Sequence, residues 1–327
     1  MQRRDFVRKI AAGAAGAATI AAPSVRAQAW PNQPIKLLIA FGAGGSTDAM
    51  FRVLAENAAP LLGQPVVVEA RPGAGGTLAP QQLLQSKPDG YTVAQVPLSF
   101  FRVPILQKVT WDPVKDVSFI IGITGYSFGT AVRADLPIKT WADYVAWAKQ
   151  NPGKMTYASS GVYTTPHLTM EEIAQRLDMD LNHIPYKGVA EIMNGILGGN
   201  VMSVSDSLGY APHVTSGKLR LLNVWGDKRA AKFPEVPTLK ELGIPIVQAS
   251  PYGLAAPKGT DPGVIRRLHD AFKKAAEMPN HIEMMAKYDQ ELIYMGSEQY
   301  TKFAEDTQRR ERAVIEKLRA QNKLPTS

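Results

Sequence analysis

The sequence at residues 35–62 is IKLLIAFGAGGSTDAMFRVLAENAAPLL, an apolar run followed by a glycine-rich turn and an amphipathic segment. The run Ile35–Phe41 has the length and the branched side chains of a buried strand. Apolar residues then recur at steps of three and four from Met50 to Leu61, which predicts a helix with one packed face. A strand, a glycine turn and a helix place free backbone N–H groups and a positive helix end at the edge of a sheet. We therefore expect an anion-binding site at Gly42–Asp48.

A second glycine-rich loop repeats this pattern further along the chain. Gly73–Thr77 follows the predicted strand Val66–Glu69, comes 31 residues after Gly42–Ser46 and again precedes a helical segment. Open α/β sheets bind ligands outside the carboxyl ends of their strands, so two such loops on adjacent strands are expected to face one crevice. The alternative is that these glycines only allow tight turns.

The remainder of the chain alternates short strand-like segments with helix-like ones. This alternation is typical of parallel sheets covered by helices. The length suits two domains of ordinary size, and no low-complexity linker divides them. We therefore predict two lobes joined by strands that cross near residues 122–133 and 245–256. Lobe one is placed at residues 30–125 and 250–327, and lobe two at residues 126–249.

Residues 1–29 have the pattern of an export signal. A basic segment with adjacent arginines, Arg3–Lys9, precedes thirteen small and weakly apolar residues, Ile10–Ala22. Small residues around Ala27 suit a signal peptidase, and the apolar part is too short to span a bilayer. We predict a cleaved twin-arginine signal peptide and a periplasmic mature protein. The alternative is an amphipathic tail that is not removed.

The composition argues against several functions. Without the leader, 32 basic and 28 acidic residues remain, evenly mixed, which disfavours binding of nucleic acid. The chain has no cysteine, so it has no disulfide, no thiolate metal site and no cysteine nucleophile. The histidines show no metal-binding spacing, and we expect neither a metal nor a cofactor. The five are His167, His183, His213, His269 and His281.

A third loop, at residues 157–168, carries hydroxyl groups at the start of another predicted helix. Thr165 followed by Pro166 predicts a hydroxyl N-cap with proline at the first helical position. A carboxylate ligand would bind well there, because charge-assisted hydrogen bonds are strong. Without a ligand, Thr165 only caps its own helix. Asp206, near the end of a later strand, would accept a hydrogen bond from a ligand hydroxyl or amine, or else cap the next helix.

A dinucleotide-binding enzyme is one alternative to simple binding. Gly42, Gly44 and Thr47 partly match the glycine motif that opens a nucleotide-binding helix. Glu69 ends the next predicted strand, where an acid that binds ribose would lie. The third glycine of the motif is missing, however, and Asp48 would face the pyrophosphate.

A hydrolase is a second alternative. Ser159 or Ser160, together with His167 and Asp206, supplies the residue types of a catalytic triad. The one Gly-x-Ser-x-Gly sequence in the chain, Gly125–Gly129, lies in the predicted crossing near residues 122–133. It includes neither Ser159 nor Ser160, so neither of these serines lies in a nucleophile elbow. The spacing from Ser160 to His167, across a helix start, also gives no reason to expect a hydrogen bond between serine and imidazole.

Short motifs occur in a fixed order from about Trp30 to the C-terminus. They are FGAGGSTD at 41–48, GQPVVVE at 63–69, RPGAGG at 71–76, PDGYT at 88–92, PGK at 152–154, SG at 160–161, PHL at 166–168, PYKG at 185–188, PEVPT at 234–238 and GLAAP at 253–257. Each motif alone is weak evidence. Together they resemble the Bug family, the periplasmic substrate-binding proteins of tripartite tricarboxylate transporters.

The resemblance implies a two-lobed periplasmic-binding-protein fold of type II, in which each lobe is a mostly parallel sheet flanked by helices. It implies that a small carboxylated metabolite, such as a di- or tricarboxylate or an aromatic acid, is held between hinged lobes and released unaltered. The protein is then not an enzyme. Its expected partners are this ligand and either the membrane subunits of a tripartite tricarboxylate transporter or a sensor protein. We also expect a monomer.

Carried over by position, the binding residues of the family fall mainly on the three loops. The implied ligand-binding residues are Gly44, Gly45, Thr47, Asp48, Ala74, Gly75, Gly76, Ser99, Ser159, Ser160, Gly161, Tyr163, Thr165, His167 and Asp206. Family members commonly have glycine where this chain has Tyr163. We expect that side chain either to narrow the pocket or to stack on an aromatic acid, near Phe100, Phe101 and Tyr126 at the mouth of the cleft.

Overall fold

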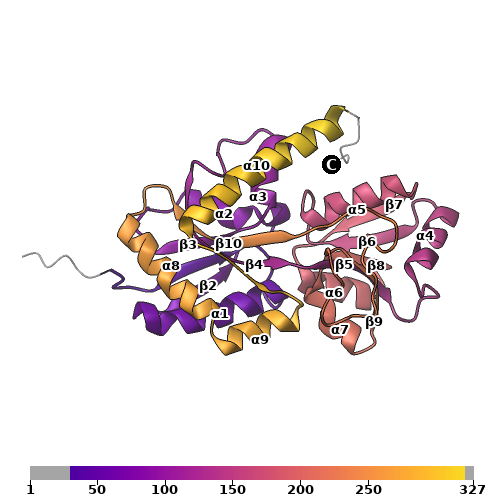
Figure 1. Cartoon of the computed structure of the whole chain (residues 1–327), viewed down its shortest axis with the longest axis horizontal. Coiled ribbons are helices and arrows are strands. Elements are labelled where there is room, and N and C mark those ends of the chain that lie inside the picture. Colours follow the sequence, from indigo (N-terminus) through magenta and orange to yellow (C-terminus); the bar gives the residue numbers. More distant parts are fainter. Residues whose placement is uncertain (1–29, 321–327) are drawn as a thin grey trace, which may run out of the picture.

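The chain folds into two lobes, each built on one β-sheet with helices packed against it (Figure 1). The computed structural model describes residues 30–320. The predicted signal peptide at residues 1–29 lies outside the described residues. The two-lobed α/β architecture is confirmed, and both sheets are mixed, because the strands near the connections between the lobes run antiparallel to their neighbours.

Lobe one contains a six-stranded sheet assembled from both ends of the chain. In order across the sheet, its strands are β11 (Leu292–Met295), β4 (Val117–Tyr126), β10 (Ser250–Pro257), β3 (Thr92–Val96), β1 (Ile35–Ile39) and β2 (Val66–Ala70). β1 is parallel to β2 and β3, whereas β10 is antiparallel to β3 and β4. The predicted strand, turn and helix at residues 35–62 are confirmed as β1 followed by α1 (Ser46–Leu62).

Lobe two contains a five-stranded sheet. In order across the sheet, its strands are β7 (Leu181–Pro185), β6 (Met155–Ser159), β8 (Ser203–Ser207), β5 (Phe128–Arg133) and β9 (Leu219–Val224). β6 is parallel to β7 and β8, and β5 is antiparallel to β8 and β9. All strands of this sheet come from the chain between Phe128 and Val224, within the residues 126–249 at which we place lobe two.

Helices flank both sheets. In lobe one they are α1, the short 3₁₀ helix η1 (Ala74–Gly76), α2 (Leu78–Leu84), α3 (Ser99–Leu106), α8 (Pro262–Ala276), α9 (Pro279–Lys287) and α10 (Ser297–Ala320). In lobe two they are α4 (Trp141–Gln150), α5 (Thr165–Arg176), α6 (Val189–Leu197), η2 (Leu208–Tyr210) and α7 (Ala211–Thr215). Within residues 30–320, none of these helices combines the length and the apolar character needed to cross a membrane.

Two connections join the lobes. β4 of lobe one leads into β5 of lobe two with only Ser127 between them, which confirms the predicted crossing near residues 122–133. The return passes through residues 225–249, which form neither strand nor helix, and reaches lobe one at the start of β10. The Ser127 hydroxyl donates to the Asp289 carbonyl at 2.6 Å, which ties the first connection to lobe one.

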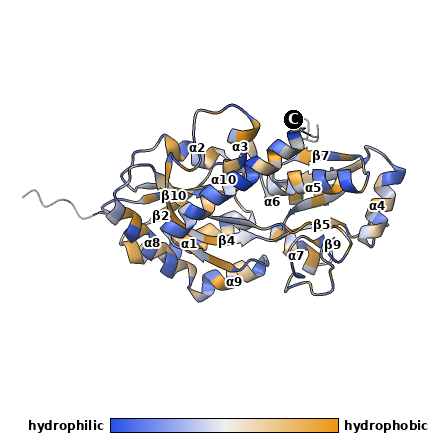
Figure 2. Cartoon of the chain, turned by 45° about the horizontal axis from the view of Figure 1, so that its top comes forward, coloured by the Kyte–Doolittle hydropathy of each residue, from blue (hydrophilic) through white to orange (hydrophobic). Residues whose placement is uncertain are grey.

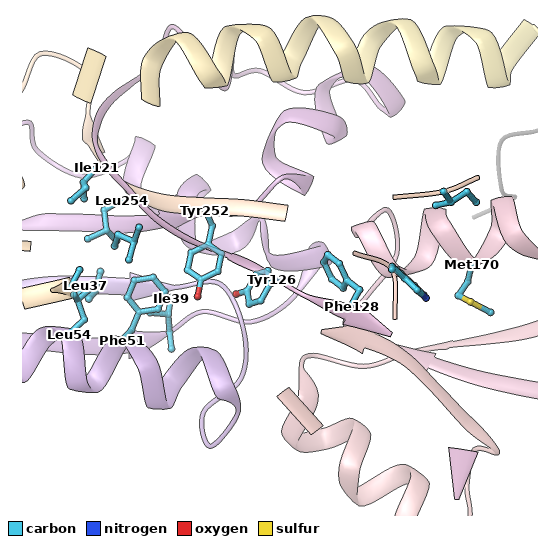
Figure 3. Close-up of a cluster of buried hydrophobic side chains, with 14 of the residues drawn as sticks. Leu37, Ile39, Phe51, Leu54, Ile121, Tyr126, Phe128, Met170, Tyr252 and Leu254 are labelled. Atoms are coloured by element: carbon cyan, nitrogen blue, oxygen red, sulfur yellow. The ribbon is translucent and has the colours of Figure 1, made fainter. Parts of the chain in front are cut away.

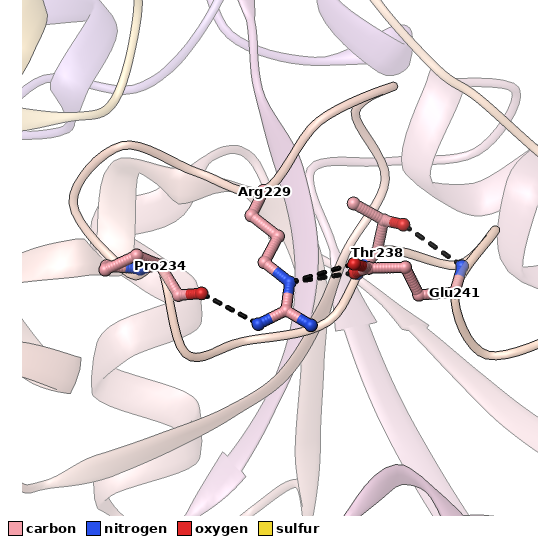
Figure 4. Close-up of polar contacts among 4 residues, drawn as sticks. All are labelled: Arg229, Pro234, Thr238 and Glu241. Carbon is pink, nitrogen blue, oxygen red and sulfur yellow. Dashed lines mark hydrogen bonds and ion pairs between the residues drawn. The ribbon is translucent and has the colours of Figure 1, made fainter.

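Polar contacts hold the returning segment in place (Figure 4). The Arg229 guanidinium donates to both carboxylate oxygens of Glu241 at 2.9 and 3.1 Å and to the Pro234 carbonyl at 2.9 Å. The Glu241 carboxylate also accepts from the Thr238 backbone N–H at 2.8 Å. Segments of this length without secondary structure are uncommon in compact domains. Here the side-chain contacts add to scattered backbone hydrogen bonds, such as those from the Leu239 N–H to the Val224 carbonyl at 3.0 Å and from the Gln248 N–H to the Trp225 carbonyl at 2.8 Å.

A hydrophobic core continues from lobe one through the connections into lobe two (Figure 3). The rings of Tyr126 on β4 and Tyr252 on β10 have their centroids 4.4 Å apart, and Phe51 of α1 lies 5.8 Å from Tyr252. Phe128 on β5 stacks on Trp225 at 5.7 Å. Aromatic pairs contribute about 0.5–1.5 kcal/mol each beyond their buried area. Hydrophilic residues lie along outer helices such as α10, with hydrophobic residues in the sheets beneath (Figure 2).

We predict that Gly253→Ala destabilises lobe one. A Cβ at Gly253 would lie 1.9 Å from the Ile121 carbonyl oxygen and 2.7 Å from the Gly122 Cα, both backbone atoms of β4. Overpacking of this kind costs about 1–3 kcal/mol in the free energy of unfolding, measured by urea denaturation. The control is Gly296→Ala, where the nearest atom lies at 3.4 Å, so the cost should be smaller. Equal losses in the two variants would contradict this.

Candidate functional site

One cavity lies between the two lobes, and both lobes and the strands that connect them contribute to its walls. Its lining consists of Phe41, Gly42, Gly45, Ser46, Thr47, Pro97, Leu98, Ser99, Tyr126, Phe128, Ser160, Thr164, Thr165, Pro166, Gly188, Val189, Asp206, Ser207 and Ser250. Hydroxyl groups and backbone predominate over charge, and none of these lining residues is lysine or arginine. Any positive potential at the walls therefore comes from backbone dipoles or from groups behind the lining.

Four helices begin at this cavity, two from each lobe. The N-cap residues of α1, α3, α5 and α6 are Gly45, Leu98, Thr164 and Gly188, and all four line it. None of these N-cap side chains accepts a hydrogen bond from its own helix. By contrast, α4 and α8, which do carry side-chain caps, begin away from the cavity. First-turn N–H groups have no partner inside a helix, so such helix starts provide donors for an anion. The start of α3 offers fewer of them, because the Phe100 and Phe101 N–H groups already donate to the Pro97 and Leu98 carbonyls at 3.0 Å.

Asp206, at the end of β8, is the acidic residue among those that line the cavity. Its carboxylate accepts from the Ser160 backbone N–H at 2.5 Å and from the Ser207 N–H at 2.7 Å, and the residue is only 2% exposed. Burial raises the pKa of Asp206 to about 6, although these hydrogen bonds oppose the shift. The carboxyl group thus titrates close to neutral pH, where it is an acceptor when charged and a donor when protonated.

A buried hydroxyl network fixes the opposite wall. The Thr47 hydroxyl and the Tyr126 hydroxyl are 2.8 Å apart, and the Gln95 amide donates to the Tyr126 oxygen at 2.8 Å. The Gln95 side-chain oxygen in turn accepts from the Ala40 backbone N–H at 2.9 Å. Burial raises the pKa of the Tyr126 phenol well above its usual range, so it stays a neutral hydroxyl. This chain of contacts joins the first glycine loop to the crossing strand β4.

Glycines let the two lobes touch beside the cavity. The Gly42 N–H in lobe one donates to the Lys187 carbonyl in lobe two at 3.1 Å, and a Cβ at Gly188 would lie 3.1 Å from the Gly42 nitrogen. A Cβ at Gly75 would lie 2.6 Å from the Val162 carbonyl oxygen, and one at Gly161 would lie 3.1 Å from the Gly75 Cα. Real Cβ atoms are essentially never found at the 2.6 Å of Gly75, and the 3.1 Å at Gly188 and Gly161 is tighter than most real contacts, so a larger residue at Gly75 above all would hold the lobes apart.

Comparison with known families shows to which family the chain belongs. A model of the tripartite tricarboxylate transporter family receptor matches residues 50–320. The chain belongs to this receptor family. The Bug resemblance is thereby confirmed, and the receptor is a solute-binding protein and not an enzyme.

Several proteins are similar to the receptor over nearly their whole length. The UPF0065 protein in gbd 5'region of Cupriavidus necator is 57% identical over 321 residues, which cover 97% of this chain and 98% of that protein. The structure of the periplasmic binding protein BugD has a TM-score of 0.84 and 29% identity, covering 88% of this chain and 98% of that one. R. palustris Rpa4515 with adipate has a TM-score of 0.80 and 26% identity, covering 88% and 97%.

Six of the sequence-predicted site residues line the cavity of the receptor. They are Gly45, Thr47, Ser99, Ser160, Thr165 and Asp206. Thr165 is not the N-cap of α5 that the sequence predicts. Thr164 is the N-cap, and the Thr164 hydroxyl donates to the Gly161 carbonyl at 2.7 Å. The Thr165 hydroxyl instead accepts a hydrogen bond at 2.8 Å from Arg102, a residue of lobe one.

Gly44, Asp48 and the second glycine loop lie outside the lining. Asp48 accepts from the Gly44 N–H at 2.9 Å and pairs with Arg52 at 2.9 Å, so it closes the first turn of α1. Gly75 packs against lobe two, and its carbonyl accepts from the Ser99 hydroxyl at 2.6 Å. Ala74 and Gly76 belong to the same short turn, η1. The second loop therefore supports the walls of the cavity and brings the lobes together, without lining the cavity itself.

Ser159, Gly161, Tyr163 and His167 belong to the third loop but do not line the cavity. His167 and His183 stack at 4.2 Å, and the Ser159 hydroxyl lies 2.7 Å from the His183 Nε2. The Tyr163 N–H donates to the His167 Nδ1 at 3.1 Å, and the two rings meet edge to face. The φ of Tyr163 is +62°, a conformation that glycine adopts more easily. Its side chain does not line the cavity, so contact with a ligand stays a prediction.

The sequence analysis missed several lining residues. Gly188 and Val189 lie at the start of α6, and their only signal in the sequence was the glycine that ends the PYKG motif at 185–188. Phe41 and Phe128 supply aromatic walls together with Tyr126, which was expected there. Phe100 and Phe101 were expected near the mouth, and this was wrong. Both are fully buried, stacked on Trp111 and Phe119, because α3 turns its aromatic face to the core of lobe one.

Neither enzyme alternative finds support in the geometry. Glu69 pairs with Lys36 at 3.2 Å and with Arg71 at 2.7 Å and does not reach the cavity. Ser159 is fully buried outside the lining, so its contact with His183 offers no accessible nucleophile. Among residues 30–320, no group of three or more histidine, cysteine or acidic residues is arranged to hold a metal ion.

We predict that the stacked histidines make the receptor less stable in acid. Burial lowers the pKa of His167 to about 4 and that of His183 to about 3. Below about pH 6.5 the unfolded chain protonates these histidines while the folded chain does not. The free energy of unfolding should therefore fall as the pH drops from 6.5 towards 3, by at most about 1.4 kcal/mol per pH unit for each histidine.

Urea denaturation between pH 7 and pH 4 measures this effect. His183→Asn should show a shallower fall than the unmodified protein, whereas the control His269→Asn, beside Asp270 in lobe one, should keep the full slope. Equal slopes for His183→Asn and the unmodified protein would contradict the assignment.

Proposed function

We propose that the receptor captures a small carboxylated metabolite between its lobes and delivers it to the membrane subunits of a tripartite tricarboxylate transporter. The convergence of four helix N-termini without side-chain caps on one cavity carries this proposal. A carboxylate satisfies such N–H groups and is favoured by the positive end of each helix. The similar R. palustris protein was solved with adipate, a dicarboxylate. The four starts lie in two lobes, so the two ends of a diacid would engage both.

Capture occurs by closure in this proposal. A ligand that contacts both lobes stabilises the arrangement in which they touch, and so shifts the population towards it. The connections β4–β5 and β10 act as the hinge. The N–H groups accept nearly any carboxylate, so the far end of the ligand determines specificity. Of the predicted binding residues, we assign direct contact to those that line the cavity and supporting roles to the others.

The cellular context follows from the same proposal. The twin-arginine leader at residues 1–29 would direct export and then be removed, so that the receptor works in the periplasm as a monomer. The membrane subunits, or a sensor protein in their place, would recognise the closed pair of lobes. Such recognition couples the presence of ligand to delivery, because the closed surface is rare without ligand.

Isothermal titration with adipate, malate, citrate and benzoate tests this function, with adipamide as the uncharged control. At least one acid should bind with 1:1 stoichiometry, and adipamide should bind at least about tenfold more weakly than adipate if adipate is accepted, because hydrogen bonds to charged groups are worth about 1.5–3 kcal/mol. Native mass spectrometry should show the acid bound with unchanged mass. Failure of every acid to bind, or chemical conversion of one, would contradict the proposal.

We further predict that Asp206 makes adipate binding depend on pH. A charged Asp206 repels a ligand carboxylate, and its pKa of about 6 means that it is half protonated at pH 6. Affinity should rise about tenfold between pH 7.5 and 6.0, because ordinary carboxylates stay ionised over this interval. His167 and His183, with pKa values of about 4 and 3, stay neutral throughout.

Asp206→Asn is the matched variant for this prediction. It removes the charge but keeps the shape, so adipate affinity should become independent of pH. The same pH dependence in this variant and in the unmodified receptor would show that another group titrates. Binding of a hydroxy acid such as malate should be less sensitive to pH, because its hydroxyl can donate to the charged Asp206.

A further inference from the structure

A buried arginine lies directly behind the cavity, at the boundary of the two lobes. Arg102, on the second turn of α3, is only 5% exposed. Its Nε and Nη2 atoms donate to the two carboxylate oxygens of Glu311 at 2.7 and 3.0 Å. Its Nη1 donates to the Thr165 hydroxyl oxygen at 2.8 Å. One guanidinium thus joins three helices: α3, α10 and, across the cleft, α5.

The contact with Thr165 determines what that hydroxyl offers to the cavity. A hydroxyl group has one proton to donate, and its oxygen accepts hydrogen bonds. Because the Thr165 oxygen already accepts from a guanidinium, its proton remains for another acceptor. Thr165 lines the cavity at the first turn of α5, so a carboxylate bound in the cavity would be within reach as that acceptor. Donation from a charged group to the oxygen also strengthens the bond that the hydroxyl makes in turn.

Glu311 holds the arginine in place from the C-terminal helix. α10 packs along α3 in lobe one (Figure 1), and Arg319 of α10 donates to the Ile105 carbonyl at the end of α3 at 2.9 Å. The bidentate pair fixes the plane of the guanidinium and neutralises its charge. The remaining Nη1 group of Arg102 is therefore directed at lobe two whether or not a ligand is present. It can donate to the Thr165 hydroxyl only when the two lobes are together.

We propose that Arg102, oriented by Glu311, is a positioning residue that latches the lobes over the ligand and turns the Thr165 hydroxyl into a carboxylate donor. This inference rests on the proposed function. It gives the C-terminal helix a part in binding, although α10 contributes no residue to the lining.

The test is a double-mutant cycle on affinity and dissociation rate, measured by stopped-flow with the acid that binds the unmodified receptor. Thr165→Val should weaken binding about tenfold, mainly through faster dissociation. The paired change Arg102→Gln with Glu311→Gln, which leaves no unpaired buried charge, should weaken binding by a similar factor. Combining all three should cost no more than Thr165→Val alone, because both changes break one interaction. Thr165→Ser should retain most of the affinity.

The control pair is Arg229→Gln with Glu241→Gln. It removes an exposed arginine–glutamate pair from the returning segment at residues 225–249, outside the lining, and should leave affinity unchanged. Losses that add in the triple variant, or unchanged affinity in Arg102→Gln with Glu311→Gln, would overturn the latch. If the unmodified receptor binds no acid, the proposed function itself fails, so the two failures are distinct. Thermal unfolding without ligand verifies that each variant is folded.

Discussion

Anion recognition by this protein depends on one constraint, which is that the first backbone N–H groups of a helix have no hydrogen-bond partner within the helix. Such groups need partners, and side chains commonly provide them, as Thr140 does for α4 and Asp261 for α8. At the cavity, the N-cap residues include Gly45, Leu98 and Gly188, which have no side chain able to do so. The fold thereby builds an anion site without a basic residue in its lining. Recognition then rests on fixed dipoles, which need no rearrangement when the ligand arrives.

Close approach of the two lobes is the second requirement, because each lobe supplies only half of the helix starts. Main-chain contact between Gly42 and Lys187, and the packing of Gly75 on Val162, are possible only without side chains at the glycines. The aromatic rings around Tyr126 and Tyr252 keep the hinge packed. A well-packed hinge and glycine edges without side chains together allow the two lobes to meet in one register and to enclose a cavity between them.

Local sequence patterns predict much of the fold and part of the site. The features that they do not predict depend on contacts between distant parts of the chain. Periodicity, glycine spacing and the family resemblance together predicted the strand, turn and helix at residues 35–62 and the first crossing between the lobes. They also predicted that the carboxyl group of Asp206 belongs to the site. The second glycine loop was predicted as part of the anion-binding site because it repeats the first. In the structure Gly75 faces the other lobe, which no spacing within one loop reveals. Likewise, Arg102 reaches Thr165 only through tertiary packing, and the start of α6 carries no N-cap signal except Gly188.

Backbone amide shifts during a titration test the use of helix N-termini most directly. In ¹⁵N-labelled protein, addition of the acid that binds most tightly in calorimetry should shift the first-turn amides of α1, α3, α5 and α6 downfield. The first-turn amides of α4 and α8, which side chains already cap, should stay in place. Downfield shifts at these four helix starts are the expected result. Binding that leaves their amides unmoved, with shifts confined to side-chain groups, would contradict the view that uncapped helix N-termini hold the ligand.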